Sequence, residues 1–252
     1  MKILIYQDYA ESNHILWQQI AKARPNASVA YCDADDIAGG ILDSSIDLLV
    51  MPGGADLYYV EKLSPKGNQL IRDYVENGGF YLGICAGSYY GCDTIEWAQD
   101  KAEHKICDKR ELGFFKGKAV GPIYPFLQDS DFDKSWNNVV PLLWNGQAPA
   151  KQDTIFYAGG PVFIPDDDAD YTALAYYEDL PEGHNLAIIS CAVGKGRAIL
   201  SSPHPEYTAE SFVKKLYRHQ NKAYERDAAL LKQLQSQKTH WLSLILSHGL
   251  EV

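Results

Sequence analysis

The sequence lacks any run of 18 apolar residues, so no transmembrane helix is predicted. Its apolar start, residues 1–6, is too short for a signal peptide and ends at Gln7 and Asp8. Cysteine is scarce: the chain has 5, an odd number, and no C-x-x-C pair. This count and spacing favour neither a disulfide framework nor a zinc site. We therefore expect reduced thiols, no metal, no organic cofactor and a cytoplasmic protein.

Basic residues are also in deficit, because 23 Lys and Arg face 33 Asp and Glu, a net charge of −10. Such a chain repels nucleic acid and anionic membranes, so we expect neither as a partner. A small-molecule substrate, a protein partner or a homodimer stays open. The 252 residues, 46% apolar and 22% charged, suffice for one large domain with a proper core.

Apolar segments alternate with helical patterns over the first half of the chain. The expected strands are residues 3–6, 28–31, 46–51 and 79–82, the expected helices are residues 13–23 and 66–76, and residues 33–42 fit a short helix or loop. This rhythm predicts an α/β fold with three α-β-α layers around a mostly parallel central sheet. Ligands bind at the carboxyl ends of strands in such sheets, and Gly53, Gly54 and Cys85 follow strand ends there.

The second half of the chain reads as β-rich and then helical. Short strands joined by turns are expected at residues 118–121, 139–143, 154–157, 172–177, 185–191 and 199–200. No Pro/Ser-rich linker separates the halves, so we expect one domain over residues 1–207. We expect residues 208–252 to form a helical extension packed on it, helical from Thr208 to about His248. Its intermittent apolar stripe is typical of core or of a dimer contact.

The pentapeptide from Gly83 to Gly87, G-I-C-A-G, directly follows an apolar strand. G-x-C-x-G in this place is the cysteine version of the nucleophile elbow. The strained turn requires glycine two positions on either side, and the helix that follows favours a thiolate at Cys85. Cys85 is therefore a candidate nucleophile; the alternative is a buried structural cysteine beside a glycine-rich turn.

A thiol nucleophile needs a base, and the base needs an orienting acceptor. Among 7 histidines, His204 stands out because it follows a strand end and lies between Pro203 and Pro205, with Glu206 two residues on. Residues i and i+2 of an extended segment point to the same side, so the Glu206 carboxylate can reach the imidazole and fix its tautomer. A plain proline-rich turn is the alternative.

These motifs, in this order and spacing, resemble the class I glutamine amidotransferases and imply their flavodoxin-like fold: Pro52-Gly53-Gly54, G-I-C-A-G and the late H-P-E. The resemblance implies Cys85 as nucleophile, His204 as base and Glu206 as orienter, in a triad that cleaves a C–N amide bond. It also implies that amides of the Gly53-Gly54 turn and of Ala86 form an oxyanion hole.

A narrower resemblance covers nearly the whole chain up to Tyr207. The segments G-G-F-Y-L-G-I-C-A-G-S-Y-Y, R-E-L-G-F-F-K-G-K-A-V-G-P, Y-A-G-G-P-V-F and G-K-G-R-A-I-L-S-S-P-H-P-E-Y are similar to the amidotransferase-like N-terminal module of biotin-protein ligases and its stand-alone bacterial relatives. It does not imply ligase activity, because the ligase catalytic domain is a separate region and no G-R-G-R-x-G-type loop occurs here.

One position departs from the glutamine-hydrolysing pattern. Those enzymes usually have Gln four residues after the cysteine, where this chain has Tyr89. A phenol does not offer the paired donor and acceptor of an amide, so Tyr89 disfavours glutamine as the small amide that is cleaved, and the identity of that amide stays open. A more aromatic pocket is expected, with Tyr58, Tyr59, Tyr89, Tyr90 and Tyr157 as candidate lining, unless these pack as ordinary core.

Two further groups are candidates near the site. Gly159 and Gly160 fit close backbone approach to a ligand, or a plain turn between strands. Asp8 and Glu11 follow the first strand and either approach Cys85 or serve as solvated or capping residues.

Three functions compete. The motifs favour an amidotransferase-like hydrolase that works through a thioester. A thiol peptidase of the related intracellular type usually has histidine directly after the cysteine, where this chain has Ala86. A ligand-binding or regulatory module without catalysis is favoured by Tyr89.

Overall fold

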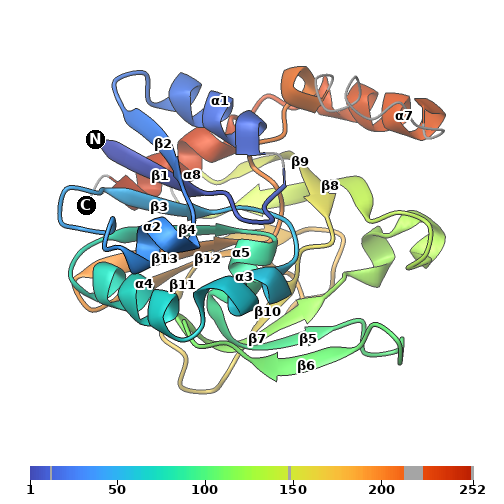
Figure 1. Cartoon of the computed structure of the whole chain (residues 1–252). Coiled ribbons are helices and arrows are strands. Elements are labelled where there is room, and N and C mark those ends of the chain that lie inside the picture. Colours follow the sequence, from blue (N-terminus) through green and yellow to red (C-terminus); the bar gives the residue numbers. More distant parts are fainter. Residues whose placement is uncertain (12, 147–148, 213–223, 251–252) are drawn as a thin grey trace.

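The structure, a computed structural model, describes the chain except residues 12, 147–148, 213–223 and 251–252 (Figure 1). A large sheet lies at its centre. Its parallel part comprises, in spatial order, β2 (Ser28–Cys32), β1 (Lys2–Tyr6), β3 (Leu48–Met51), β4 (Phe80–Ile84) and β13 (Gly196–Ser201). An antiparallel part continues it through β12 (Leu186–Val193), β11 (Thr172–Tyr177), β8 (Asn137–Trp144) and β9 (Lys151–Ala158).

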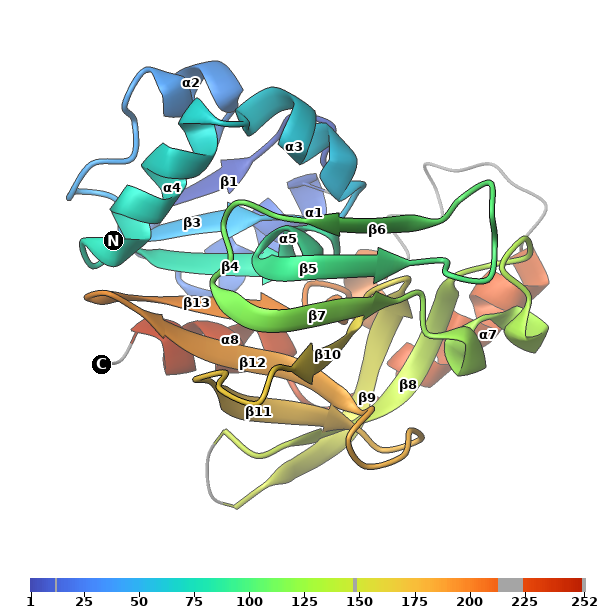
Figure 2. The same cartoon turned by 90° about the horizontal axis from the view of Figure 1, so that it is seen from below.

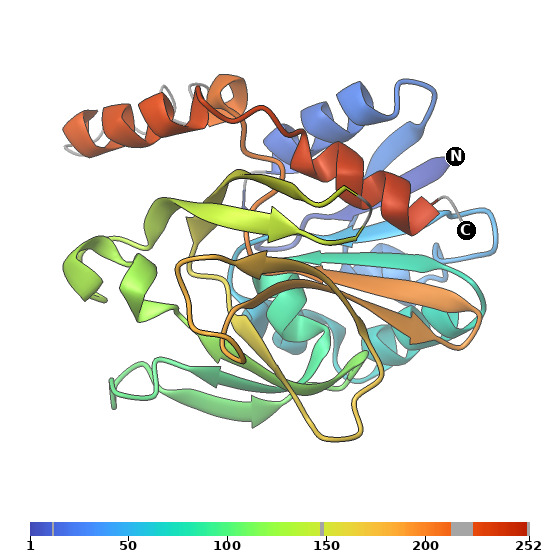
Figure 3. The same ribbon diagram turned by 180° about the vertical axis from the view of Figure 1, so that it is seen from behind.

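Helices cover both faces of this sheet, which gives the predicted three layers (Figures 1 and 3). On one face lie α1 (Asn13–Ala23) and α8 (Trp241–Leu250), which contact each other. On the other face lie α2 (Ala34–Ala38), α3 (Asp56–Leu63), α4 (Lys66–Glu76) and the short α5 (Ala86–Tyr90). The α/β fold class and the helices over residues 13–23 and 66–76 are confirmed.

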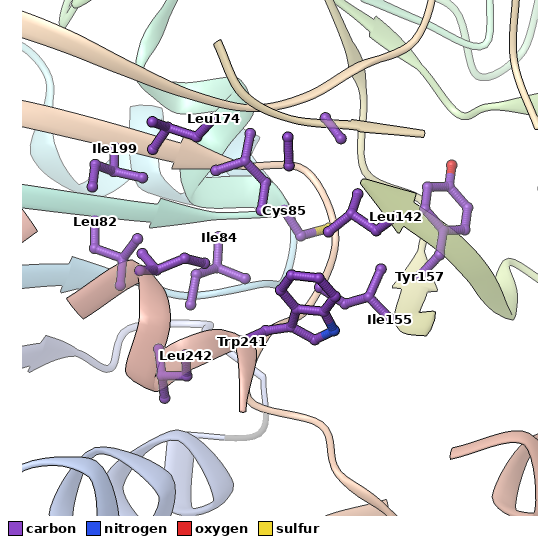
Figure 4. Packing of buried hydrophobic residues seen from close by; sticks show 14 of the residues in the cluster. Leu82, Ile84, Cys85, Leu142, Ile155, Tyr157, Leu174, Ile199, Trp241 and Leu242 are labelled. Carbon is purple, nitrogen blue, oxygen red and sulfur yellow. The ribbon is translucent and has the colours of Figure 1, made fainter. Parts of the chain in front are cut away.

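The central strands are apolar throughout because both of their faces are covered. In β1, Ile3 and Ile5 belong to the core under α1 and α8, whereas Leu4 and Tyr6 belong to the core under α2 to α5. β3 and β4 divide their side chains in the same alternating way. Figure 4 shows the first of these cores from close by, with Leu82, Ile84 and Ile199 of the sheet beside Trp241 and Leu242 of α8.

A second, smaller sheet packs beside α5, on the face of the central sheet that carries α2 to α5 (Figures 1 and 2). Its order is β10 (Val162–Pro165), β7 (Phe115–Gly121), β5 (Cys92–Trp97) and β6 (Ile106–Lys109). Two short 3₁₀ segments, Tyr124–Phe126 and Gln128–Ser130, follow β7. The sequence analysis missed α3, β5, β6 and β10. Their short, partly polar segments carry a weak periodic signal, and their partners lie far along the chain.

The C-terminal region is not one helical stretch from Thr208 to His248, as the sequence suggested. After α7 (Tyr224–Leu234) the helix stops, and residues 237–240 are not helical before α8 begins. The Asp153 carboxylate accepts the backbone N–H groups of Lys238 and Thr239, at 2.7 and 2.6 Å, and these bonds replace helical ones.

The described part of the apolar stripe packs against its own chain. Leu230 and Leu234 cluster with Phe156 and Phe212, and Ile245 of α8 lies in the core over the central sheet. Leu216 of the stripe lies outside the described residues. The division at residue 207 and a homodimer stay predictions.

All five cysteines lie within the described residues and are free thiols. Cys107 is exposed, whereas the other four are buried and belong to the two cores on either side of the central sheet. Among the described residues, no helix is long and apolar enough to cross a membrane.

Candidate functional site

Cys85 lies on a sharp turn between β4 and α5, at the carboxyl end of the parallel strands. Its backbone has φ 49° and ψ −103°, in the left-handed half of the map where side chains are strained. A Cβ on Gly83 would lie 2.3 Å from the carbonyl oxygen of Gly87, and a Cβ on Gly87 would lie 2.1 Å from that of Met51. Both glycines are thus required by close backbone approach. The turn is held by the N–H of Cys85, which donates to Ser201 O at 2.8 Å.

His204 reaches Cys85 because two strands that are distant in sequence end beside it. β13 pairs with β4 in parallel, with Ser201 opposite Ile84, so the segment after β13 passes the elbow. The backbone N–H of His204 then donates to Phe156 O of β9 at 2.9 Å. The imidazole lies over Gly53, where an added Cβ would be 2.7 Å from His204 Cε1 and 3.7 Å from the Cβ of Cys85. Glycine at position 53 therefore makes room for the ring next to the thiol.

Glu206 holds the other side of the imidazole. Its Oε1 lies 2.8 Å from His204 Nδ1, and both side chains are at least nine-tenths buried. Because Nδ1 is occupied, Nε2 is the nitrogen left for the sulfur of Cys85, which is close enough to raise the pKa of the imidazole. The sulfur also lies 3.5 Å from the carbonyl oxygen of Ala158. The structure thus brings Cys85, His204 and Glu206 into one connected row of side chains.

The charges in this row govern the proton on His204. Burial lowers the pKa of the imidazole, but the Glu206 carboxylate and the Cys85 sulfur outweigh burial and raise that pKa from 6.5 to about 10. The imidazole is therefore protonated at neutral pH and places a positive charge beside the sulfur of Cys85.

The Gly53-Gly54 turn faces the elbow with its backbone fixed. The hydroxyl of Tyr59 donates to the carbonyl oxygens of Pro52 and Gly53, both at 3.1 Å, and Glu11 N donates to the latter at 3.0 Å. Gly54 has φ 143°, a conformation that favours glycine. Among the described residues, the N–H groups of Gly54 and Ala86 have no hydrogen-bond acceptor, and both residues line the cavity at Cys85.

A cavity of about 470 Å³ opens at Cys85 between α3, α5 and the smaller sheet. Cys85, Ala86 and Gly54 line it together with several aromatic residues. The residues of this aromatic wall are Tyr89, Trp97, Phe132 and Trp136. A cavity of this size suits a small organic ligand.

Tyr89 is the one tyrosine of the expected set that lines this cavity within the described chain. Its hydroxyl donates to Gly159 O at 3.1 Å, and burial raises its pKa, so the phenol keeps its proton. Its ring meets that of Trp97 edge to face, with centroids 5.8 Å apart. Gly159 also lines the cavity, with φ 80° and a would-be Cβ 3.3 Å from Trp136.

The other expected lining residues lie elsewhere. Tyr157 is fully buried in the core, accepting from Ile123 N at 2.8 Å and donating to Gly160 O at 2.9 Å. Tyr58 is 45% exposed and stacks on Tyr9 outside the cavity. A Cβ on Gly160 would lie 2.1 Å from Ser202 O, so this glycine allows the turn after β9 to approach the segment after β13 closely.

Four other candidates have structural roles in this chain. Tyr59 fixes the Gly53-Gly54 turn, and the buried Tyr90 donates its hydroxyl to Asn68. The Asp8 carboxylate accepts a hydrogen bond from Ala34 N at the start of α2 at 2.9 Å, which agrees with the capping role. The backbone N–H of Glu11 donates to Gly53 O of the Gly53-Gly54 turn.

Sequence reasoning missed the aromatic wall beyond Tyr89. Trp97 ends β5, and its ring centroid lies 5.1 Å from that of Trp136 and 6.1 Å from that of Phe132. His104 stacks on Phe132 at 5.1 Å. The one signal available was the presence of tryptophan in the polar segments E-W-A-Q-D and D-K-S-W-N-N, where nothing local requires a large apolar ring.

A buried ion pair at the cavity was missed as well. Arg110 Nε lies 2.7 Å from Asp56 Oδ2, and Asp56 opens α3 and lines the cavity. Burial raises the pKa of Asp56, while Arg110 works against that rise. Among the described residues, no group of three or more His, Cys, Asp or Glu is arranged to hold a metal.

Comparison with known proteins gives one family and one fold. The model of a family described as biotin-protein ligase, N terminal, matches residues 1–252. A biotin–protein ligase of Schizosaccharomyces pombe is 30% identical over 215 residues, which are 83% of this chain and 34% of that protein. This chain thus spans about a third of the length of that ligase.

Two further proteins match over most of their length. An uncharacterised protein of Chlamydia muridarum is 34% identical over 217 residues, 83% of this chain and 82% of that one. A glutamine amidotransferase of Thermotoga maritima has a similar structure, with a TM-score of 0.60 at 16% identity, covering 100% of this chain and 99% of that one.

Proposed function

This chain belongs to the biotin-protein ligase N-terminal family and has a glutamine amidotransferase-like fold, and from this premise we propose that it is a cysteine-dependent hydrolase of C–N amide bonds. Its substrate is a small-molecule amide. The contact between Cys85, His204 and Glu206 carries this proposal, because it joins a nucleophile, a base and an orienting carboxylate.

In the first half of the reaction, Cys85 Sγ attacks the carbonyl carbon of the amide. The carbonyl oxygen gains the negative charge, and the N–H groups of Gly54 and Ala86 donate to it; removal of one such donor typically costs a factor of about 10²–10³ in rate. The imidazolium of His204 gives its Nε2 proton to the leaving nitrogen. The C–N bond then breaks, which releases an amine or ammonia and leaves a thioester on Cys85.

In the second half, a water molecule attacks the thioester. His204, now neutral, takes a proton from that water while Glu206 steadies the imidazolium that forms. The C–S bond breaks, the carboxylic acid leaves, and the thiolate–imidazolium pair is restored. Atoms balance as one amide and one water giving one acid and one amine.

The decisive experiment traps the thioester. The purified protein is incubated with a panel of small amides and activated esters, quenched in acid and analysed by intact-mass and peptide mass spectrometry. We expect an acyl adduct on Cys85 and turnover of at least one amide, both absent in Cys85→Ala. Cys107→Ala, which removes the exposed thiol, is the matched control and should retain both.

A second function is supported by Tyr89. At this position a phenol takes the place of the glutamine that amidotransferases use, and its hydroxyl is committed to Gly159 O. The family would then include members that keep the fold as a ligand-binding or regulatory module. Such a module predicts saturable binding of the same amides to wild type and to Cys85→Ala, with no adduct and no turnover in either.

A further inference from the structure

The cavity and His204 lie on different sides of the Cys85 sulfur. Cys85, Gly54 and Ala86 line the cavity, whereas His204 is not among its described lining residues and approaches the sulfur from the side of Gly53 and Phe156. The leaving nitrogen must face His204 to receive its proton. The acyl group of the substrate therefore points the other way, into the cavity.

The aromatic wall offers this acyl group little but apolar surface. Its rings form a connected cluster, with Trp97–Trp136 and Phe132–Trp136 centroids 5.1 and 5.3 Å apart. The polar atoms of two of its rings are already used inside the protein: Tyr89 donates to Gly159 O, and Trp136 Nε1 donates to Phe132 O at 2.9 Å. Leu57, Ile95 and Ile106 add aliphatic surface to the lining.

The charged groups at the cavity are poorly suited to hold the α-amino and α-carboxylate groups of an amino acid. Asp56 is already paired with Arg110. Glu103, His104 and Lys105 lie exposed on the loop between β5 and β6, where solvent weakens an ion pair. A site that recognises a polar head group places fixed, buried partners against it.

We propose that the substrates of this site are amides with an apolar, preferably aryl, acyl group that stacks within the aromatic wall. This proposal rests on the proposed hydrolase and specifies its substrate class. The hydrophobic group supplies binding, and the oxyanion turn and the thiol act on the carbonyl at its end. Glutamine, whose acyl chain ends in two charges, is then a poor substrate.

Acyl-chain selectivity tests the proposal directly. The values of kcat/KM are compared for acetamide, hexanamide, 3-phenylpropanamide and glutamine, with the released ammonia as a common readout. We expect kcat/KM to be roughly tenfold or more higher for 3-phenylpropanamide than for acetamide, because burial of the aromatic ring stabilises the bound substrate. The value of kcat/KM for glutamine should be close to that for acetamide. A ranking with glutamine first would overturn the proposal.

A variant pair shows whether the wall is responsible. Trp136 and Trp17 are both 39% exposed, but Trp136 lines the cavity and Trp17 lies on α1. In Trp136→Ala the ratio of kcat/KM for 3-phenylpropanamide to that for acetamide should fall roughly tenfold, because the substrate ring loses one aromatic contact. In Trp17→Ala that ratio should stay within about twofold of wild type. An unchanged ratio in Trp136→Ala contradicts the proposal.

Binding to Cys85→Ala separates failure of this inference from failure of the proposed function. Calorimetry of that variant should give a tighter Kd for 3-phenylpropanamide than for glutamine by roughly tenfold or more. If this preference is present but no amide is turned over by wild type, the hydrolase proposal fails and the substrate-class inference survives as a ligand class. If adducts form but the preference is absent or reversed, only the inference fails.

Discussion

The substitution Glu206→Gln tests whether the carboxylate sets the proton on His204. The carboxylate lies 2.8 Å from Nδ1 and is buried with the ring, so their charge centres are about 4 Å apart. At an effective dielectric constant of about 20, two unit charges at that distance attract by about 4 kcal/mol, which corresponds to about three pH units. Without this attraction, the imidazole pKa should fall from about 10 to about 7, because burial is then opposed by the Cys85 sulfur alone.

The assay is alkylation of Cys85 by iodoacetamide as a function of pH, followed by peptide mass spectrometry. In wild type the imidazolium persists to about pH 10. A cation beside a cysteine favours its reaction with an electrophile, so we expect a high and nearly constant rate between about pH 7 and 9. In Glu206→Gln most of the imidazolium is lost above about pH 7, so the rate at about pH 8 should drop by roughly tenfold. Imidazole resonances in a parallel NMR titration report the His204 proton itself.

The exposed glutamate Glu210, paired with Lys22 at 2.6 Å, provides the control. Glu210→Gln should leave the alkylation profile of Cys85 unchanged. Oε2 of Glu206 has no partner among the described residues, so the amide oxygen that Glu206→Gln introduces can keep the bond to Nδ1 without repacking. If the Glu206→Gln profile matches wild type, the argument that this carboxylate holds the His204 proton is refuted.

The same pKa fixes a pH dependence of stability. Because the folded-state pKa of His204 is raised above the unfolded value, its contribution to the free energy of unfolding is fully present below about pH 6.5. That contribution is lost as pH rises through about 10. Urea unfolding of wild type should therefore show a decline across this window that Glu206→Gln lacks.

Three further substitutions probe the site and its supports. Gly53→Ala places a Cβ 2.7 Å from the His204 ring and should lower kcat roughly 100-fold by displacing the base, measured on the best amide. Tyr89→Phe removes one buried hydrogen bond and should lower the free energy of unfolding by about 1 kcal/mol in urea titrations. Arg110→Met leaves the Asp56 carboxylate buried without its cation and should cost about 3–5 kcal/mol in the same titrations.

Each of these has a matched control. Gly39→Ala, at a helix end with φ −78°, should leave kcat unchanged. Tyr58→Phe removes an exposed hydroxyl and should leave stability unchanged. Loss of the exposed Lys116–Asp168 pair through Lys116→Met should leave the urea midpoint nearly unchanged, because solvent screens an exposed pair. If a variant and its control change kcat or the free energy of unfolding equally, the contact assigned to that residue does not make the proposed contribution.

Local pattern predicted the parallel half of the fold well. Continuous apolar runs at residues 3–6, 46–51 and 79–82 mark strands that are covered on both faces, and each of them is a central strand. The helices at residues 13–23 and 66–76 begin and end where their periodicity does. The glycines at positions 83 and 87 are where the elbow turn requires them, since a Cβ at either would meet a backbone oxygen.

The sequence by itself determined the elbow, the H-P-E segment and the rhythm of the parallel strands, because these depend on neighbours a few residues away. Only the tertiary structure decided what surrounds the thiol. β4 and β13 lie far apart along the chain, and their pairing, together with the bridge from His204 to Phe156 of β9, delivers His204 to Cys85. The wall of Trp97, Phe132 and Trp136 joins β5 to segments beyond β7. Strand order and ring packing depend on hydrogen bonds and burial between residues that are far apart in the sequence. The local periodicity of apolar residues therefore does not predict them.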